Sequence, residues 1–142
     1  MKSSPGIGDV HQFSFRVGDT KVVPALYPES DIFQSMPAVF ATGFMVGLME
    51  WACTEHLRPH LEAGEGSLGV HIDVSHTAPT LPGQVVTVTV TCDKVDGRRL
   101  GWSVVARDEL DVIGEGRHER AVVVWDRFNQ KLEEKRRRWQ GA

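Results

Sequence analysis

The stretch ATGFMVGLMEWAC, residues 41–53, constrains the fold more than any other part of the chain. It is almost entirely apolar, and Glu50 is its one charged residue. Thr42 is a suitable N-cap and a turn-rich segment follows Pro59, so the stretch predicts a helix from about Thr42 to about Leu57. A helix that is apolar on most sides is buried on most sides. We therefore expect this helix at the centre of the fold.

Segments in which polar and apolar residues alternate predict strands at 11–17, 68–76, 85–93, 100–108 and 113–125. In the second strand the alternation puts His76 on the inward face and His71 on the outward face. The other inward residues of that strand are Leu68, Val70, Ile72 and Val74. Asp96-Gly97 predicts a two-residue hairpin turn. One long helix combined with five antiparallel strands indicates an α+β fold.

The segment 22–40 is punctuated by prolines and rich in large apolar residues, so it predicts neither a strand nor a long helix. A loop with this much apolar surface should cover something apolar, either as a lid over a site or by packing against the core. The basic segment 127–142 predicts a solvated tail or amphipathic helix, and a role in contacting phosphate is the alternative. A length of 142 residues suits one domain with a single core, and we expect one domain spanning 1–142.

Composition and charge exclude some classes of protein. The chain is 41% hydrophobic and 25% charged with a net charge of −3, which gives no reason to expect nucleic acid or an anionic membrane as a partner. Cys53 and Cys92 have no CxxC spacing, so we expect buried free thiols in a reducing compartment. No apolar signal segment opens the chain, which favours the cytoplasm. The histidines lack acidic or thiolate neighbours at ligand spacing, so we expect neither a metal nor a cofactor.

Glu50 needs a partner, because a buried unpaired carboxylate either protonates or recruits another polar group. His76 is the candidate, since it points inward and a carboxylate beside an imidazole is a common acid–base arrangement. The alternative is a core histidine with no role in chemistry. Thr42 is the third candidate, because a hydroxyl at a helix N-terminus lies beside N–H groups that stabilise an oxyanion, although a helix cap explains it equally well.

Spacing on the helix then constrains the quaternary structure. Thr42 and Glu50 are separated by eight residues, which on a helix is a rise of roughly 12 Å. Within one chain they would not share a substrate carbonyl. Two antiparallel helices in a symmetric dimer would bring Thr42 of one subunit near Glu50 of the other. We therefore predict a homodimer with active sites at the subunit interface.

These residues carry a resemblance to a known family. An uncharged segment entering a helix with one acid at its middle, followed by antiparallel strands, resembles the hotdog fold of acyl-CoA thioesterases, a five-stranded sheet wrapped around a central helix. The similarity is most specific to the fluoroacetyl-CoA thioesterase family, and it extends from about Leu26 to Phe128. Its motifs are LYPES (26–30), VFATGFMVGLMEWAC (39–53), GEGSLG (64–69), HTA (76–78), GRRL with Trp102 (97–102) and HERAV (118–122).

The resemblance implies cofactor-free hydrolysis of a short acyl-CoA thioester, most specifically fluoroacetyl-CoA, and assigns catalysis to Thr42, Glu50 and His76. It also implies that Gly69 and Arg120 surround the acyl pocket, and it maps lid aromatics onto Phe33 and Met36. The helix start adds Gly43 through its N–H group, and the apolar loop adds Val23 and Leu26.

Several alternatives remain open from the residues. The family would carry phenylalanine where Met36 stands, and a flexible thioether packs differently from a rigid ring. The substrate is therefore fluoroacetyl-CoA or another small or aryl acyl-CoA, and a non-catalytic acyl-CoA-binding dimer is the rival from another class. Glu50 either attacks the thioester directly or orients a water or the imidazole. Arg120 either pairs with an acid or lines the pocket.

Overall fold

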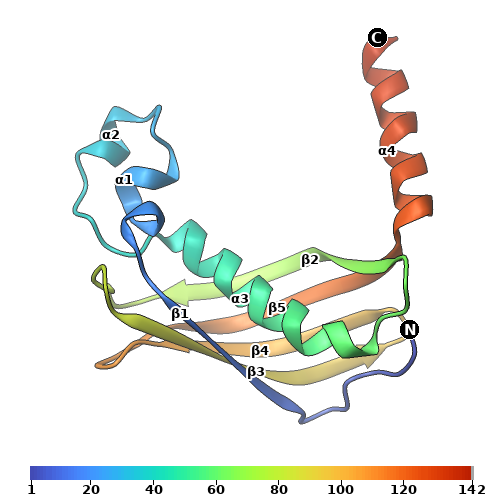
Figure 1. Cartoon of the computed structure of the whole chain (residues 1–142), viewed down its shortest axis with the longest axis horizontal. Coiled ribbons are helices and arrows are strands. Elements are labelled where there is room, and N and C mark those ends of the chain that lie inside the picture. Colours follow the sequence, from blue (N-terminus) through green and yellow to red (C-terminus); the bar gives the residue numbers. More distant parts are fainter. Residues whose placement is uncertain (142) are drawn as a thin grey trace.

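A computed structural model describes residues 1–141 and contains one antiparallel sheet against a long helix (Figure 1). The sheet has five strands in the order β1-β3-β4-β5-β2. Their bounds are β1 Val10–Arg16, β2 Glu65–His76, β3 Val85–Asp96, β4 Arg99–Arg107 and β5 Val112–Val124. The helices are α1 Val23–Leu26, α2 Asp31–Gln34, α3 Thr42–Leu57 and α4 Trp125–Gln140, with 3-10 turns at Asp19–Lys21 and Arg58–His60. The predicted α+β hotdog architecture is confirmed.

The core lies between α3 and the concave face of the sheet (Figure 1). The alternation of the sequence identifies its members correctly, because the inward residues of β3 and β4 are all buried. From β3 these are Val86, Val88, Val90 and Cys92, and from β4 they are Leu100, Trp102, Val104 and Ala106. The helix contributes Met45, Leu48, Met49, Ala52, Cys53 and Leu57. Cys53 and Cys92 are buried and unbridged, as predicted.

A β-bulge in β2 corrects the predicted orientation of that strand. The pairing with β5 shifts register between Gly69 and His71, so Val70 is the extra residue and is 43% exposed. Gly69 pairs with the buried Arg120, and therefore Leu68, one residue earlier, faces away from the helix. The prediction that Leu68 faces inward is wrong, and Val70 interrupts the predicted alternation because it has no partner in β5. Beyond the bulge the prediction holds, and Ile72, Val74 and His76 share the helix side.

The hairpin between β3 and β4 differs from the prediction by one residue. Asp96 pairs with Arg99, so the two turn residues are Gly97 and Arg98 rather than Asp96 and Gly97. Gly97 adopts φ 59°, and in this turn it is the residue with positive φ, which is the arrangement of a type II′ turn.

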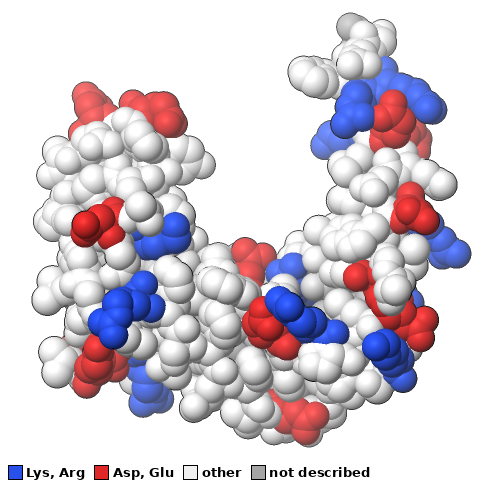
Figure 2. Space-filling view, viewed as in Figure 1, with Lys and Arg blue, Asp and Glu red and all other residues white. Residues whose placement is uncertain are grey.

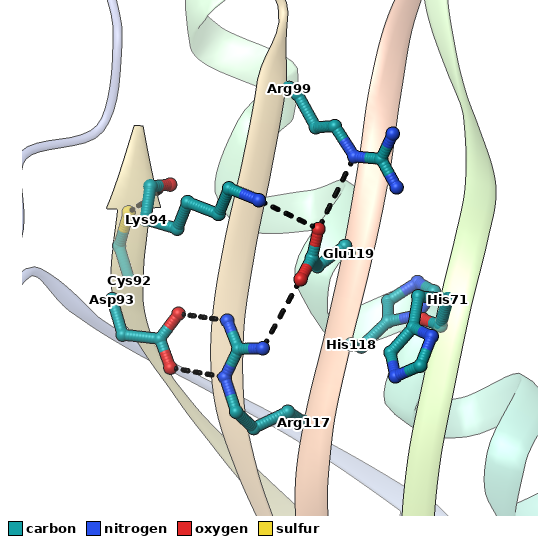
Figure 3. A network of polar contacts seen from close by, with 8 residues as sticks. All are labelled: His71, Cys92, Asp93, Lys94, Arg99, Arg117, His118 and Glu119. Atoms are coloured by element: carbon teal, nitrogen blue, oxygen red, sulfur yellow. Dashed lines mark hydrogen bonds and ion pairs between the residues drawn. The ribbon is translucent and has the colours of Figure 1, made fainter. Parts of the chain in front are cut away.

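The face of the sheet opposite α3 carries a network of ion pairs around Glu119 (Figure 3). Glu119 Oε1 accepts from Lys94 Nζ and Arg99 Nε at 3.2 Å each, and its Oε2 accepts from Arg117 Nη1 at 3.2 Å. Arg117 also holds Asp93 through two bonds. Lys94 first and then Arg117 lower the pKa of Glu119 to about 2. The network ties β3, β4 and β5 together on a face that does not meet the helix.

Two projections flank the upper edge of the molecule in Figure 1. The short helices α1 and α2 stand at the end where α3 begins, and α4 rises from the end of β5. Figure 2 shows a wide hollow between them. Its floor follows β2, which is the last strand in the sheet order and has a free edge. No helix of residues 1–141 is long and apolar enough to cross a membrane. The predicted tail of 127–142 is helical to Gln140, and Ala142 lies outside the described residues.

Candidate active site

Thr42 and His76 meet at the N-terminus of α3. Thr42 Oγ1 lies 2.8 Å from His76 Nδ1, although the two residues are 34 positions apart in the chain. The N-cap of α3 is Ala41, so the predicted role of Thr42 as a helix cap is wrong. The hydroxyl is instead directed at the imidazole that ends β2.

The start of α3 leaves backbone donors available. The first intrahelical bond runs from the Met45 N–H to the Ala41 carbonyl at 2.9 Å, and the Ala41 cap has no side-chain acceptor. The N–H groups of Thr42, Gly43 and Phe44 therefore precede the first hydrogen-bonded turn. Together with the positive end of the helix dipole, they form a place where a thioester carbonyl oxygen can gain negative charge.

The environment of His76 favours the neutral imidazole. Burial is the main cause and lowers the pKa of His76 below its ordinary value of 6.5. Its Nε2 atom is buried and has no hydrogen-bond partner among residues 1–141. A neutral imidazole with a free nitrogen can exchange a proton with the Thr42 hydroxyl, a water or a leaving group.

Glu50 has a partner inside the protein, and that partner is Arg120. Arg120 Nη1 donates to Glu50 Oε1 at 3.0 Å, and the Arg120 side chain is 8% exposed against 40% for Glu50. Arg120 Nε also donates to Ser67 Oγ at 2.8 Å, and Nη2 donates to the Ser67 carbonyl at 3.0 Å. Of the two roles open to Arg120, the ion pair is therefore present.

His118 fixes the other side of the Arg120 guanidinium. His118 Nδ1 lies 2.7 Å from the His71 carbonyl, which only accepts, so Nδ1 carries the proton. His118 Nε2 then accepts from Arg120 Nη1 at 3.1 Å. Burial lowers the pKa of His118, which agrees with this neutral tautomer. The result is a chain of bonds from the His71 backbone to the carboxylate of Glu50.

Gly69 is needed beside this carboxylate. A Cβ atom at residue 69 would lie 2.7 Å from Glu50 Oε1 and 3.2 Å from the His118 ring. Any larger residue would therefore displace the carboxylate. Glu50 and Gly69 share a hollow of about 400 Å³, which is also lined by Val46, Val70, His71, Ile72 and His118.

The predicted lid residues divide into two groups. Val23 lines a hollow of about 310 Å³ together with Thr42 and His76. Leu26 lies over the helix start, since a Cβ at Gly43 would approach Leu26 Cδ1 to 3.2 Å. Phe33 instead pairs with Tyr27, with ring centroids 6.0 Å apart, and Met36 is 40% exposed.

The predicted site residues thus form two separate clusters rather than one, and we call these clusters half-sites. Thr42 and His76 form the first, while Glu50, Gly69 and Arg120 form the second. The expectation that Glu50 pairs with His76 is not met within one chain. Sequence reasoning did not assign Ser67 or His118. The alternation of β5 already puts His118 and Arg120 on the same inward face, so His118 could have been found from the sequence. Ser67 reaches that face only because of the bulge in β2.

Comparison with known proteins identifies the family of the chain. Residues 23–126 match the family of fluoroacetyl-CoA-specific thioesterases. The chain is 53% identical to the fluoroacetyl-CoA thioesterase of Streptantibioticus cattleyicolor, over 95% of this chain and 97% of that protein. A crystal structure of the fluoroacetyl-CoA thioesterase FlK superposes with a TM-score of 0.91, covering 94% of this chain and 98% of the other at 53% identity. A thioesterase superfamily member from Thermus thermophilus is 30% identical with a TM-score of 0.88, and each chain is fully covered. The chain belongs to the fluoroacetyl-CoA-specific thioesterase family.

Proposed function

We propose that this protein hydrolyses fluoroacetyl-CoA to fluoroacetate and CoA, as a homodimer of single-domain subunits with active sites at the interface. The observation that carries the proposal is the Thr42–His76 pair at 2.8 Å beside the uncapped start of α3. This arrangement suits a thioester carbonyl, and Val23 lines the hollow beside it while Leu26 lies over Gly43 at the helix start. The 53% identity to a fluoroacetyl-CoA thioesterase supports the choice of substrate.

The dimer follows from the separation of the two half-sites. The free edge of β2 can pair with β2 of a second copy, and antiparallel pairing around a two-fold axis would place the two α3 helices side by side. In that arrangement Glu50 of one subunit approaches Thr42 and His76 of the other. Each active site would then contain one half-site from each subunit, and the hollow of Figure 2 would hold the partner.

The chemistry then assigns a role to each group. The thioester oxygen accepts from the Thr42 hydroxyl and from backbone N–H near Gly43, which stabilise the tetrahedral intermediate. In one route Glu50 attacks the carbonyl carbon, the CoA thiolate leaves, and water hydrolyses the resulting anhydride. In the other route Glu50 or the neutral His76 takes a proton from an attacking water. Single turnover in ¹⁸O-water separates them, because only the anhydride route can leave ¹⁸O in Glu50.

The acyl pocket is proposed to combine residues of the lid with residues of the second half-site, namely Val23, Leu26, Phe33, Met36, Gly43, Gly69 and Arg120. Met36 lies in the exposed part of the lid. It would therefore affect the choice of acyl group through the closure of the lid over the substrate rather than through the hydrolysis step. The free thiols of Cys53 and Cys92 fit action in the reducing cytoplasm.

Steady-state hydrolysis of fluoroacetyl-CoA, acetyl-CoA, propionyl-CoA and a phenylacyl-CoA tests the proposal. We expect the highest kcat/KM for the fluorinated substrate. Comparable kcat/KM values for several acyl groups would still support thioesterase activity but would contradict selectivity for the fluorinated substrate. Binding of all four without turnover would contradict the proposal and favour a binding protein. Glu50→Gln is the matched control, and we expect it to lose turnover while it keeps its affinity for the CoA esters.

A further inference from the structure

A further hollow lies at the base of α4, and its lining combines cationic and apolar groups. It has a volume of about 380 Å³. Arg98, Arg127 and Lys131 supply the charge, while Val122–Val124 and Phe128 supply the apolar surface. Such a lining suits a ligand that carries both anionic groups and a flat hydrophobic ring.

The positive charge of this hollow is not neutralised by the protein. Arg98 Nη2 lies 2.6 Å from Glu65 Oε2, but the amino group of Met1 occupies the same carboxylate at 2.8 Å from Oε1. Two cations therefore share one acid. Within residues 1–141, Arg127 and Lys131 have no ion-pair partner, and their i, i+4 spacing puts them on one face of α4.

The hollow and the second half-site are neighbours along β5, although they share no lining residue. Val122, which lines it, follows Arg120 by two residues on the same face of β5, a distance of about 7 Å along the strand. Ser67, which holds Arg120, pairs with Val122. A substrate whose thioester reaches Glu50 can therefore extend its long arm toward Arg127 and Lys131.

The position of α4 along β2 identifies which acyl site the hollow serves. The Trp125 N–H donates to the Gly64 carbonyl at 2.9 Å, so α4 begins at the Glu65 end of the strand. His76 ends the same strand, and its twelve residues span roughly 36 Å, more than the arm of CoA covers. Antiparallel pairing of two β2 edges would instead bring the Glu65 end of one subunit beside His76 of the other.

We propose that this hollow binds the 3′-phosphorylated ADP end of coenzyme A, with Arg127 and Lys131 contacting its phosphates, while the acyl group lies against Thr42 and His76 of the partner subunit. This rests on the proposed function and its dimer. Guanidinium and ammonium groups form charge-assisted bonds to phosphate, and the apolar floor accommodates the adenine. Arg98 also lines this hollow.

The binding test does not require turnover. Adenosine 3′,5′-bisphosphate is titrated calorimetrically into the wild-type protein and into the double variant Arg127→Ala/Lys131→Ala. We expect the double variant to lose at least about tenfold in affinity, and a matched pair farther along the helix, Lys135→Ala/Arg138→Ala, to lose less than about twofold. Unchanged affinity in the first variant, or an equal loss in both, would overturn the proposal.

The kinetic test compares fluoroacetyl-CoA with fluoroacetyl-pantetheine, which lacks the nucleotide. In Arg127→Ala/Lys131→Ala we expect KM for the CoA ester to rise at least about tenfold with kcat unchanged, while both parameters for the pantetheine ester stay at wild-type values. An equal rise in KM for both esters would refute the subsite. Failure of the proposed function is recognised separately, because the wild-type protein would then hydrolyse neither ester whatever the nucleotide fragment binds.

Discussion

Replacing Gly69 with alanine would displace the Glu50 carboxylate without disturbing the fold. The added Cβ would lie 2.7 Å from Glu50 Oε1, whereas an ordinary contact begins at 3.4 Å, so the oxygen must move by at least about 0.7 Å. Gly69 does not have a positive φ, and therefore alanine costs no backbone strain at that position. The obstacle is the end of a flexible side chain that is 40% exposed, so we expect the unfolding free energy to change by less than about 1 kcal/mol.

The catalytic cost should be much larger than the structural cost. Moving a reacting group by about 1 Å can reduce the rate of an enzyme on the order of 100-fold. We expect kcat for fluoroacetyl-CoA to fall between about 10-fold and 100-fold in Gly69→Ala, with the Arg120 bond to Glu50 at 3.0 Å broken or rotated.

The assay is steady-state hydrolysis alongside urea unfolding, with Gly18→Ala as the matched control, because a Cβ at Gly18 meets nothing within 4 Å. The control should retain wild-type kcat and stability. A Gly69→Ala enzyme with wild-type kcat would refute the reasoning, since it would mean that the position of Glu50 in this structure does not matter for the reaction. A large loss of stability would refute it in another way, by showing that the fold and not the carboxylate had changed.

Three further outcomes follow from the same contacts. His118→Phe keeps an aromatic ring but removes one of the two acceptors of Arg120 Nη1 and the donor to the His71 carbonyl, so we expect kcat to fall and urea unfolding to show a loss of about 1–3 kcal/mol. Gly43→Ala should push Leu26 by a few tenths of an ångström, since its Cβ would lie 3.2 Å from Leu26 Cδ1; relative kcat/KM for acetyl-CoA and propionyl-CoA should shift while the unfolding midpoint stays the same. Burial lowers the pKa values of His76 and His118 below their ordinary 6.5, so protons bind the unfolded chain more strongly and stability should fall as pH drops below about 6.5. Urea unfolding between pH 7.5 and pH 5 measures that slope, and His118→Phe should flatten it; a slope of opposite sign would contradict the burial of these imidazoles.

Much of the fold could be predicted because it depends on simple periodicity. Val86, Val88 and Val90 alternate with threonines, and a strand with that pattern has one buried face in almost any antiparallel sheet. The helix predicted from about Thr42 to about Leu57 is α3, Thr42–Leu57, and its end could be placed because the apolar run is bounded by a clear stop at Pro59.

The errors arise where tertiary contacts overrule local pattern. The bulge at Val70 inverts the orientation of Leu68, and no periodicity reveals an inserted residue in advance. Thr42 is a residue type that commonly caps a helix, yet its hydroxyl bonds to His76. His76 comes near Thr42 only because β2 runs back toward the start of α3.

The contact that Glu50 makes within its own chain could not be chosen from the sequence for a related reason. Strand parity put both His76 and Arg120 on the helix side, but parity does not say how far along the strand each residue lies from Glu50. The pairing of Gly69 with Arg120 decides which residue contacts Glu50. That pair lies beside the middle of α3, whereas His76 lies at the start of the helix. The eight-residue separation of Thr42 and Glu50 is the basis for predicting a shared site between subunits, and that site stays a prediction.

The central claim is that one active site draws Thr42 and His76 from one subunit and Glu50 from the other. It is tested by a purified hybrid dimer, in which one subunit carries Thr42→Ala and the other carries Glu50→Gln. Both homodimers of these variants should be inactive on fluoroacetyl-CoA. The account predicts that the hybrid regains about half of the wild-type kcat, because one of its two sites combines the unaltered Thr42 with the unaltered Glu50. A hybrid as inactive as its parents, or a protein that is monomeric at assay concentration, would contradict the shared site.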